Sequence, residues 1–290
     1  MTHDLAALTE ELVQGAPGAG AWSPAAFGEQ VRQHLRLAWQ RESERHSRVA
    51  VTDVMEALSD ASDAAVRAIS AFALYQTGNP QRLGRRIAVL ALGSYGRRAL
   101  NPYSDLDLCV LHAAAPARPL DLFSQYFVPM VFDTQHPASC NIETAEEARA
   151  LVADDLSAYT AHLDARLVCG NRAAFRAWRV QLSAYTAEHR DAIAERLRGT
   201  VDELLDSEEP YAVAPQVKAG AGGLRHAHAA HWLVRVVHRV AKLDDLQGLG
   251  LITRDDLLAY SRAYTFLLRV RNALHFLARR SEDRLLLEWQ

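Results

Sequence analysis

Two aspartates separated by one residue lie in an apolar run. Asp105 and Asp107 flank Leu106 at the start of the segment 105–111. Because successive side chains of a strand point to opposite faces, both carboxylates are expected on one face, about 6–7 Å apart. Carboxylates this close repel each other, and a divalent cation removes that penalty. Mg²⁺ prefers a few carboxylates together with substrate phosphates, so the pair indicates a Mg²⁺ or Mn²⁺ site.

A glycine-bearing turn precedes the aspartates. Gly93 and Ser94 follow the apolar run 87–92, and Arg97 and Arg98 come next. Backbone N–H groups in such a turn cradle phosphate, and the arginines add positive charge. Phosphate beside paired carboxylates suits a two-metal, in-line phosphoryl or nucleotidyl transfer. Taken singly, the aspartates fit a surface-facing pair and the turn fits an ordinary bend, so only the combination favours this chemistry.

A second basic, glycine-rich stretch stands at 218–225. Lys218 and Arg225 enclose Gly220, Gly222 and Gly223, just before a segment with helical character at 224–242. A basic glycine turn at a helix N-terminus favours anions. The alternative, weighed equally, is a turn that only starts the helix.

The elements that position these motifs follow from hydrophobic spacing. Runs at 87–92 and 105–111 predict strands, and a third strand is expected within 131–142. Helices are expected at 24–49, 50–77 and 120–130, and the chain beyond Thr144 is expected to be helical, including 156–168, 171–199, 224–242 and 253–280. We therefore predict three parts: an N-terminal helical segment 1–79, an α/β core 80–143 and a helical domain 144–290.

Composition limits the class of protein. The chain has 290 residues, 49% hydrophobic and 23% charged, with a formal net charge of −3, which is typical of a globular protein. This balance predicts neither a nucleic-acid nor a membrane partner. Three cysteines without a C-x-x-C pair predict neither a disulfide framework nor a structural zinc site, and Cys109 is expected to be a small buried side chain. Without a signal peptide or long apolar run, a cytoplasmic location is expected.

Gly93-Ser94 followed by Asp105-Leu106-Asp107 resembles the signature of the DNA polymerase β-type nucleotidyltransferase superfamily. The longer string 93–111 (GSYGRRALNPYSDLDLCVL) resembles one branch, the bacterial PII-protein uridylyltransferases. The segments 217–225 and 267–290 are similar to the same branch. The resemblance implies an α+β fold, with a small mixed β-sheet and flanking helices followed by a mainly helical domain.

The resemblance also implies an activity. A nucleoside monophosphate, UMP or less favourably AMP, would move from UTP or ATP to a tyrosine hydroxyl of PII, a small nitrogen-signalling protein. Asp105 and Asp107 would be catalytic and hold Mg²⁺ or Mn²⁺. The nucleotide-binding residues would be Gly93, Ser94, Arg97, Lys218, Gly222, Gly223 and Arg225.

The chain departs from the family pattern at several positions. Ser94 replaces a glycine, and His226 replaces an aspartate. The strand expected to carry a third carboxylate is not recognisable, which leaves Asp133, Glu143 or no residue for that role. Two alternatives therefore stay open: a catalytically weak or inactive nucleotide-binding regulatory module, and a transferase with another acceptor.

Overall fold

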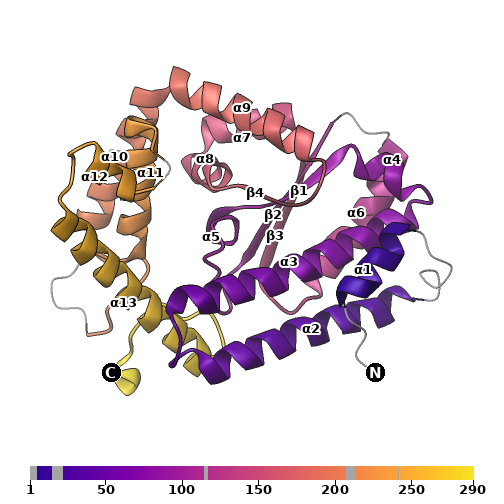
Figure 1. Cartoon of the computed structure of the whole chain (residues 1–290), viewed down its shortest axis with the longest axis horizontal. Coiled ribbons are helices and arrows are strands. Elements are labelled where there is room, and N and C mark those ends of the chain that lie inside the picture. The colour runs from indigo at the N-terminus through magenta and orange to yellow at the C-terminus, as the bar shows by residue number, and fades with distance from the viewer. Residues whose placement is uncertain (1–4, 15–21, 114–116, 207–212, 241) are drawn as a thin grey trace. The chain divides into compact units, whose positions relative to one another are not determined.

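The computed structural model describes residues 5–14, 22–113, 117–206, 213–240 and 242–290. Its contacts divide the chain into two compact units, 1–180 and 181–290, which are described separately. The three-part division predicted from the sequence stays a prediction. The α+β class is confirmed, since many helices accompany a small mixed sheet (Figure 1).

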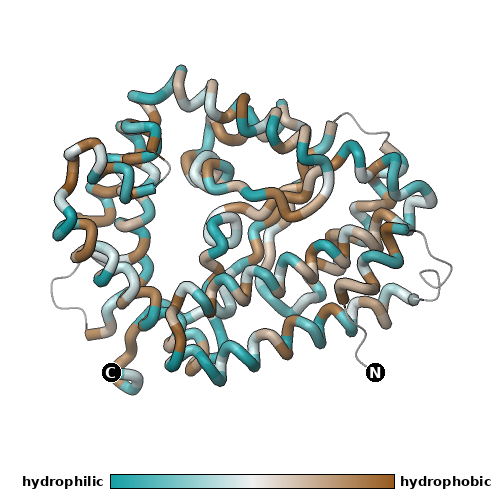
Figure 2. Tube along the Cα trace, viewed as in Figure 1, coloured by the Kyte–Doolittle hydropathy of each residue, from teal (hydrophilic) through white to brown (hydrophobic). Residues whose placement is uncertain are grey.

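The first unit is built on a four-stranded sheet in the order β3-β2-β1-β4. The strands are β1 (Ile87–Ala91), β2 (Leu106–His112), β3 (Ala138–Thr144) and β4 (Arg166–Gly170). β1 runs antiparallel to β2 and β4, whereas β2 and β3 are parallel. All five residues of β1 are buried, and Figure 2 shows hydrophobic residues along the central strands. The two strands predicted from apolar runs are confirmed, and the third begins directly after Pro137.

The prediction that the chain beyond Thr144 is helical is wrong at 166–170. Helix α8 (Leu156–Leu163) ends early, and the chain enters β4. β4 is an edge strand of five residues whose pairing with β1 includes Leu167 opposite Leu90. Gly170 lies so close to the carbonyl of Ile87 that no side chain fits there, and its φ is +93°. Tertiary pairing therefore decides the conformation of a segment whose local pattern is ambiguous.

Helices cover the sheet of the first unit. They are α1 (Leu5–Gln14), α2 (Pro24–Arg45), α3 (Val51–Gln76), α4 (Pro80–Gly84), α5 (Gly93–Gly96), α6 (Ala117–Phe132), α7 (Ala145–Asp154) and α8; α9 (Arg172–Glu188) crosses into the second unit. The N-caps follow the sequence: the Ser23 hydroxyl accepts from the Ala26 amide before Pro24. Thr144 and Glu147 form a capping box at the start of α7. α3 is the most buried helix and contacts α1, α2 and α6.

The second unit contains α10 (Arg190–Asp206), α11 (Leu224–His238), α12 (Asp244–Gly248), α13 (Arg254–Ala278) and a 3₁₀ turn at Leu287–Trp289. α11 packs against α10 and α13. The backbone of Asp283–Leu285 runs along the residues before α11: Val217 N–H donates to Asp283 O, and Leu285 N–H donates to Pro215 O. In the part of the chain that the structure describes, no helix is long and apolar enough to cross a membrane.

Candidate active site

The structure brings Gly93 and Asp107 into contact. Gly93 opens the short helix α5 directly after β1, and Asp107 is the second residue of β2, the neighbouring strand. The Leu92 amide donates to the Asp107 carbonyl at 2.9 Å. A Cβ at Gly93 would lie 3.4 Å from the Asp107 carboxylate, and Gly93 has a φ of +53°. The positive φ therefore favours glycine at this position, and a side chain there would stand in van der Waals contact with the carboxylate.

Asp107 is held in place by its neighbour on β3. The Ser139 hydroxyl donates to Asp107 Oδ1 at 2.9 Å, and the two residues are paired in the parallel register of β2 and β3. Asp107 is half-buried, whereas Asp105 is exposed. Asp105 lies one residue before β2, so the expectation that both aspartates sit within the strand is wrong for Asp105. The two-residue spacing of an extended chain still favours one common side for the two carboxylates.

Neither proposed third carboxylate is paired with Asp107 in the sheet. The register places Ser139 opposite Asp107 and Glu143 opposite Leu111. Glu143 therefore lies on the same face but four residues further along, about 13 Å by the rise of a strand. Asp133 follows α6 and forms an ion pair with Arg32 of α2. A serine hydroxyl thus occupies the position on β3 that faces Asp107.

A buried ion pair supports the turn from behind. Asp63 of α3, whose side chain is 2% exposed, accepts bonds from both terminal nitrogens of Arg166 on β4, at 2.7 and 2.9 Å. The Tyr95 hydroxyl donates to Asp63 at 2.8 Å. Arg166 also donates to the carbonyls of Tyr95 and Gly96, both at 3.3 Å. Charge-assisted hydrogen bonds of Asp63 and Arg166 therefore connect α5 to α3 and β4.

The surroundings of Tyr95 and Arg166 raise the pKa values of both side chains. Burial, together with the adjacent Asp63, raises the pKa of Tyr95 well above its ordinary value, so its hydroxyl stays a donor. Burial lowers the pKa of Arg166, but the hydrogen bonds and charge of Asp63 outweigh this and raise it overall.

Sequence reasoning missed this support, because Asp63 lies in an ordinary helical pattern and Arg166 in a strand that was expected to be helical. An aspartate among the apolar positions of α3 was the available signal.

Arg97, predicted to contact nucleotide, ends α5 and forms an ion pair with the buried carboxylate of Asp164. Asp164 follows α8, and its carbonyl lies against Gly96, where a Cβ would also approach the Ala91 carbonyl at 2.8 Å. Gly96 therefore permits α5 and the end of α8 to touch. Arg98 pairs with Asp60 of α3 at 2.7 Å. Both arginines of the basic turn thus have acidic partners within the first unit.

The residues predicted from the second glycine-rich stretch lie in the second unit. Lys218 is half-buried, Gly223 is the N-cap of α11, and Arg225 is exposed at its second position. Gly222 has a φ of +71°, and a Cβ there would meet nothing within 4 Å. At Gly223 a Cβ would meet the carbonyl of Gly220 at 2.7 Å, so close packing requires this glycine.

The amides of this second turn are used internally. The N–H groups of Leu224 and Arg225 donate to the carbonyls of Val217 and Lys218, at 3.1 and 2.8 Å. The Gly222 amide donates to His226 Nδ1 at 2.9 Å. These three amides donate to acceptors within the loop and its helix, so they are not available to an external anion. Contacts with phosphate would have to come from the side chains of Lys218 and Arg225, whose predicted role stays a prediction.

Comparisons with known proteins agree with the resemblance seen in the motifs. Residues 173–290 match the family model described as GlnD PII-uridylyltransferase. A bifunctional uridylyltransferase/uridylyl-removing enzyme of Novosphingobium aromaticivorans is 31% identical over 222 residues, which cover 75% of this chain and 24% of that protein. The protein of the same name from Erythrobacter litoralis is 33% identical over 229 residues, again 75% and 24%.

A third relative with this name, from Burkholderia thailandensis, is 30% identical over 247 residues, or 83% of this chain and 27% of its own length. An alignment that covers three quarters of 290 residues necessarily includes the site at 93–107. The resemblance is therefore confirmed for both units, and the chain spans about a quarter of the length of these curated relatives.

Proposed function

We propose that this chain, a relative of the PII-uridylyltransferases, carries a Mg²⁺-dependent nucleotidyltransferase site at the turn 93–96 and Asp107. The observation that carries the proposal is the contact between Gly93 and the Asp107 carboxylate, 3.4 Å from the position of a Cβ. This contact places an acidic group directly beside the start of a helical turn. The first amides of such a turn have no partner within it, which suits a phosphate.

The residues present suit a divalent cation. Asp105 and Asp107 offer hard carboxylate oxygens, and the Ser139 hydroxyl orients one oxygen of Asp107. Mg²⁺ takes such oxygens together with phosphate oxygens. When bound there, the ion would neutralise triphosphate charge and stabilise the departing pyrophosphate. Both Mg²⁺ and Mn²⁺ fit this set of oxygens.

The chain's own residues position the reacting groups. Gly93 and Ser94 would bind phosphate oxygens through their amides, and Asp63 with Arg166 keeps the turn rigid. Because catalysis of phosphoryl transfer is mostly positioning and electrostatic stabilisation, a rigid turn beside the Asp107 carboxylate supports a role in the transfer step. Lys218, Gly222, Gly223 and Arg225 are proposed to assist nucleotide binding, with the side chains supplying the charge.

The substrate and acceptor follow from the relatives. Their names indicate uridylyl transfer, and the family description names PII. We propose UTP as the donor, with ATP as the less favoured one, and a tyrosine hydroxyl of a PII-type protein as the acceptor. The bond formed joins that hydroxyl oxygen to the α-phosphorus, the bond broken releases pyrophosphate, and the hydroxyl proton passes to solvent. A cytoplasmic location and a role in nitrogen regulation belong to the same proposal.

The test is incubation of the purified chain with a PII protein, Mg²⁺ and each of the four nucleoside triphosphates in turn. Intact-mass spectrometry should show the PII protein gaining one uridylyl group with UTP, and no gain after its acceptor tyrosine is changed to phenylalanine. Asp107→Asn should abolish the gain, and Asp133→Asn, outside the proposed metal site, should retain it. Equal labelling by wild type and Asp107→Asn would overturn the proposal.

A second candidate function is a nucleotide-binding module with weak or no transfer. The observation that favours it is Ser139, which faces Asp107 where the third carboxylate of the superfamily was sought. In that case UTP binds with Mg²⁺, but neither pyrophosphate nor labelled PII appears. A mass gain on a different protein or small molecule would instead identify a transferase with another acceptor.

A further inference from the structure

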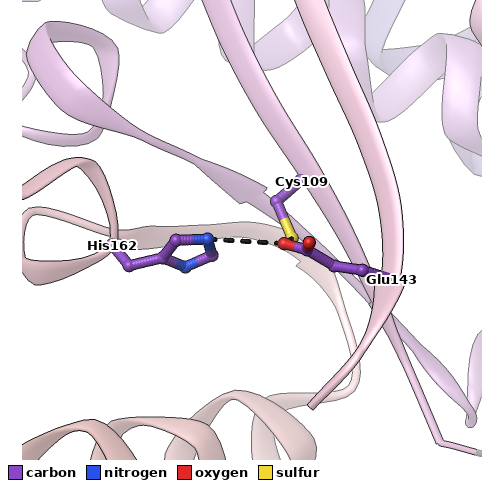
Figure 3. A group of neighbouring side chains, drawn as sticks. All are labelled: Cys109, Glu143 and His162. Atoms are coloured by element: carbon purple, nitrogen blue, oxygen red, sulfur yellow. Dashed lines mark hydrogen bonds and ion pairs between the residues drawn. The ribbon is translucent and has the colours of Figure 1, made fainter. Parts of the chain in front are cut away.

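Three side chains that commonly bind metals meet in the core of the first unit. Cys109 comes from β2, Glu143 from β3 and His162 from α8, and Figure 3 shows them pointing toward one another. Cys109 Sγ donates to Glu143 Oε1 at 3.1 Å, and His162 Nε2 lies 3.4 Å from the same oxygen. Their residues are 0%, 7% and 1% exposed, respectively. None of the three has a part in the proposed transfer.

The spacing of the three atoms is close to that of a tetrahedral metal site. Bonds of about 2.3 Å to sulfur and 2.0–2.2 Å to nitrogen and oxygen separate tetrahedral ligand atoms by roughly 3.3–3.6 Å. The distance of 3.4 Å between the nitrogen and the oxygen already fits this range. The distance of 3.1 Å between the sulfur and the oxygen must lengthen by a few tenths of an ångström. All three atoms lie within 4.8 Å of one another.

The cluster also has an unsatisfied polar atom. His162 Nδ1 is buried and has no hydrogen-bond partner among the described residues. Burial raises the pKa of Glu143, but the hydrogen bonds from His162 and Cys109 and the charge of His162 lower it overall. A carboxylate, a thiol and an imidazole thus meet out of contact with solvent, and buried polar groups of this kind are commonly paired or bound to a metal ion.

We propose that Cys109, Glu143 and His162 bind one Zn²⁺ ion, at a site separate from the Mg²⁺ site and independent of the proposed function. A thiolate, a carboxylate and a neutral imidazole balance the two charges of the ion. The combination of sulfur, nitrogen and oxygen ligands selects zinc over magnesium, which takes oxygen. On binding, the Cys109 S–H bond breaks, a Zn–S bond forms, and the proton leaves to the buffer.

The site would join β2, β3 and α8 close to the catalytic strand. Cys109 lies two residues after Asp107 on the same face of β2, and His162 lies two residues before Asp164, the partner of Arg97. With three protein ligands, the ion keeps one coordination position for water. The absence of a C-x-x-C pair does not bear on such a site, because its ligands come from three separate elements.

The experiment is metal loading of the full chain of 290 residues after treatment with a chelator. Elemental analysis after dialysis against Zn²⁺ with excess Mg²⁺ should give one equivalent of zinc. With Co²⁺ as a spectroscopic substitute, the wild type should show a sulfur-to-cobalt charge-transfer band. Cys109→Ser and His162→Gln should each lose the band and the zinc, whereas Cys140→Ser, on the adjacent strand but outside the cluster, should keep both.

Two further variants keep the test decisive. Asp107→Asn should retain the cobalt–thiolate band, because the proposed Mg²⁺ site does not hold this ion. Glu143→Gln, which preserves size and hydrogen bonding, should weaken zinc binding at least tenfold even if Cys109→Ser fails to fold. Wild-type protein without a band, or a band that disappears in Cys140→Ser rather than in Cys109→Ser, would overturn the zinc site and leave a hydrogen-bonded core cluster.

Discussion

The two glycine-bearing turns of this chain look alike in sequence but use their glycines differently. In the turn at 93–96, Gly93 lies against the Asp107 carboxylate, and Asp63 with Arg166 fixes the backbone from behind. In the turn at 218–223, Gly223 lets the loop close on its own carbonyls. The first turn is built around a neighbouring acidic group, whereas the second mainly starts a helix.

The difference lies in where the amides point. In the second turn, the amides of Gly222, Leu224 and Arg225 are all bonded within the loop. In the first, the later amides of Gly96 and Arg97 close the helical turn on Leu92 and Gly93. The opening amides of a helical turn are the ones free of such bonds by geometry. We therefore expect the backbone amides of the first turn to be available to a phosphate, whereas the second turn offers an anion only its side chains.

The largest expected effect is loss of transfer in Asp107→Asn. Removal of one charged group that stabilises a transition state lowers the rate by about 10²–10³. The amide keeps the side-chain shape and can still accept from Ser139, so the unfolding free energy should change by less than about 1 kcal/mol. Rates come from the PII-labelling assay and stability from urea unfolding.

The matched control for that variant is Asp133→Asn. Asp133 pairs with Arg32 away from the turn, so its loss should leave transfer within about twofold. If Asp133→Asn is as inactive as Asp107→Asn, then Asp133 is the third carboxylate, and its placement outside the metal site is wrong.

Next in size is the effect of Asp63→Asn on stability. Removal of one partner from a buried ion pair leaves Arg166 without its counter-charge and costs about 3 kcal/mol. Because Arg166 and Tyr95 would no longer hold α5 in place, the affinity for nucleotide should fall together with the stability. Scanning calorimetry with and without UTP measures both quantities. Asp60→Asn, on the same helix, removes only the exposed pair with Arg98 and should cost below about 1 kcal/mol. Equal losses in the two variants would contradict a special support for the first turn.

The second turn should respond to acid through Asp283. Burial raises the pKa of Asp283, but hydrogen bonds from His275 and Arg271 and their charges bring it well below its ordinary 3.8. Because folding lowers the pKa of Asp283, its ionised carboxylate stabilises the folded state at pH values above 3.8. This stabilisation is lost as the pH falls toward the lower pKa of the folded protein. Asp283→Asn should therefore cost about 2 kcal/mol near pH 7 and progressively less below pH 3.8. Unfolding curves across pH measure the difference, and a constant gap would refute the assignment.

The smallest effects come from a matched pair of glycine substitutions. Gly93→Ala and Gly222→Ala both force a residue with a side chain into positive φ, at about 1 kcal/mol each. Only at Gly93 does the new methyl group also reach van der Waals contact with the Asp107 carboxylate, beside the proposed metal and phosphate site. Transfer should fall about tenfold in Gly93→Ala. Gly222→Ala, whose Cβ meets open space, should stay near the wild-type rate. Equal activity in the two variants would remove the distinction between the turns.

The sequence predicts those parts of the fold that local pattern controls. The apolar runs gave β1 and β2, and the Ser23 and Thr144 caps set helix starts where they were expected. β4 was missed because its strand character comes from pairing with β1 rather than from alternation along 166–170. The placement of Asp105 just outside β2 lies within the usual uncertainty of strand ends.

The candidate site was predictable only in its linear part. Gly93, Ser94, Asp105 and Asp107 lie in one short stretch, so the motif reveals them. Asp63 and Arg166 are 103 residues apart, and their meeting depends on tertiary structure that no spacing encodes. The internal bonds of the second turn are likewise visible only in the folded loop, and the predicted role of Lys218, Gly222, Gly223 and Arg225 stays a prediction.

The central claim is that Asp107, beside Gly93, holds a divalent ion against the triphosphate. The most direct measurement is calorimetric titration of a non-hydrolysable UTP analogue into the wild type and Asp107→Asn, each with and without Mg²⁺. The account predicts that Mg²⁺ strengthens binding at least tenfold in the wild type and has no effect in the variant. The same Mg²⁺ dependence in both proteins would contradict it.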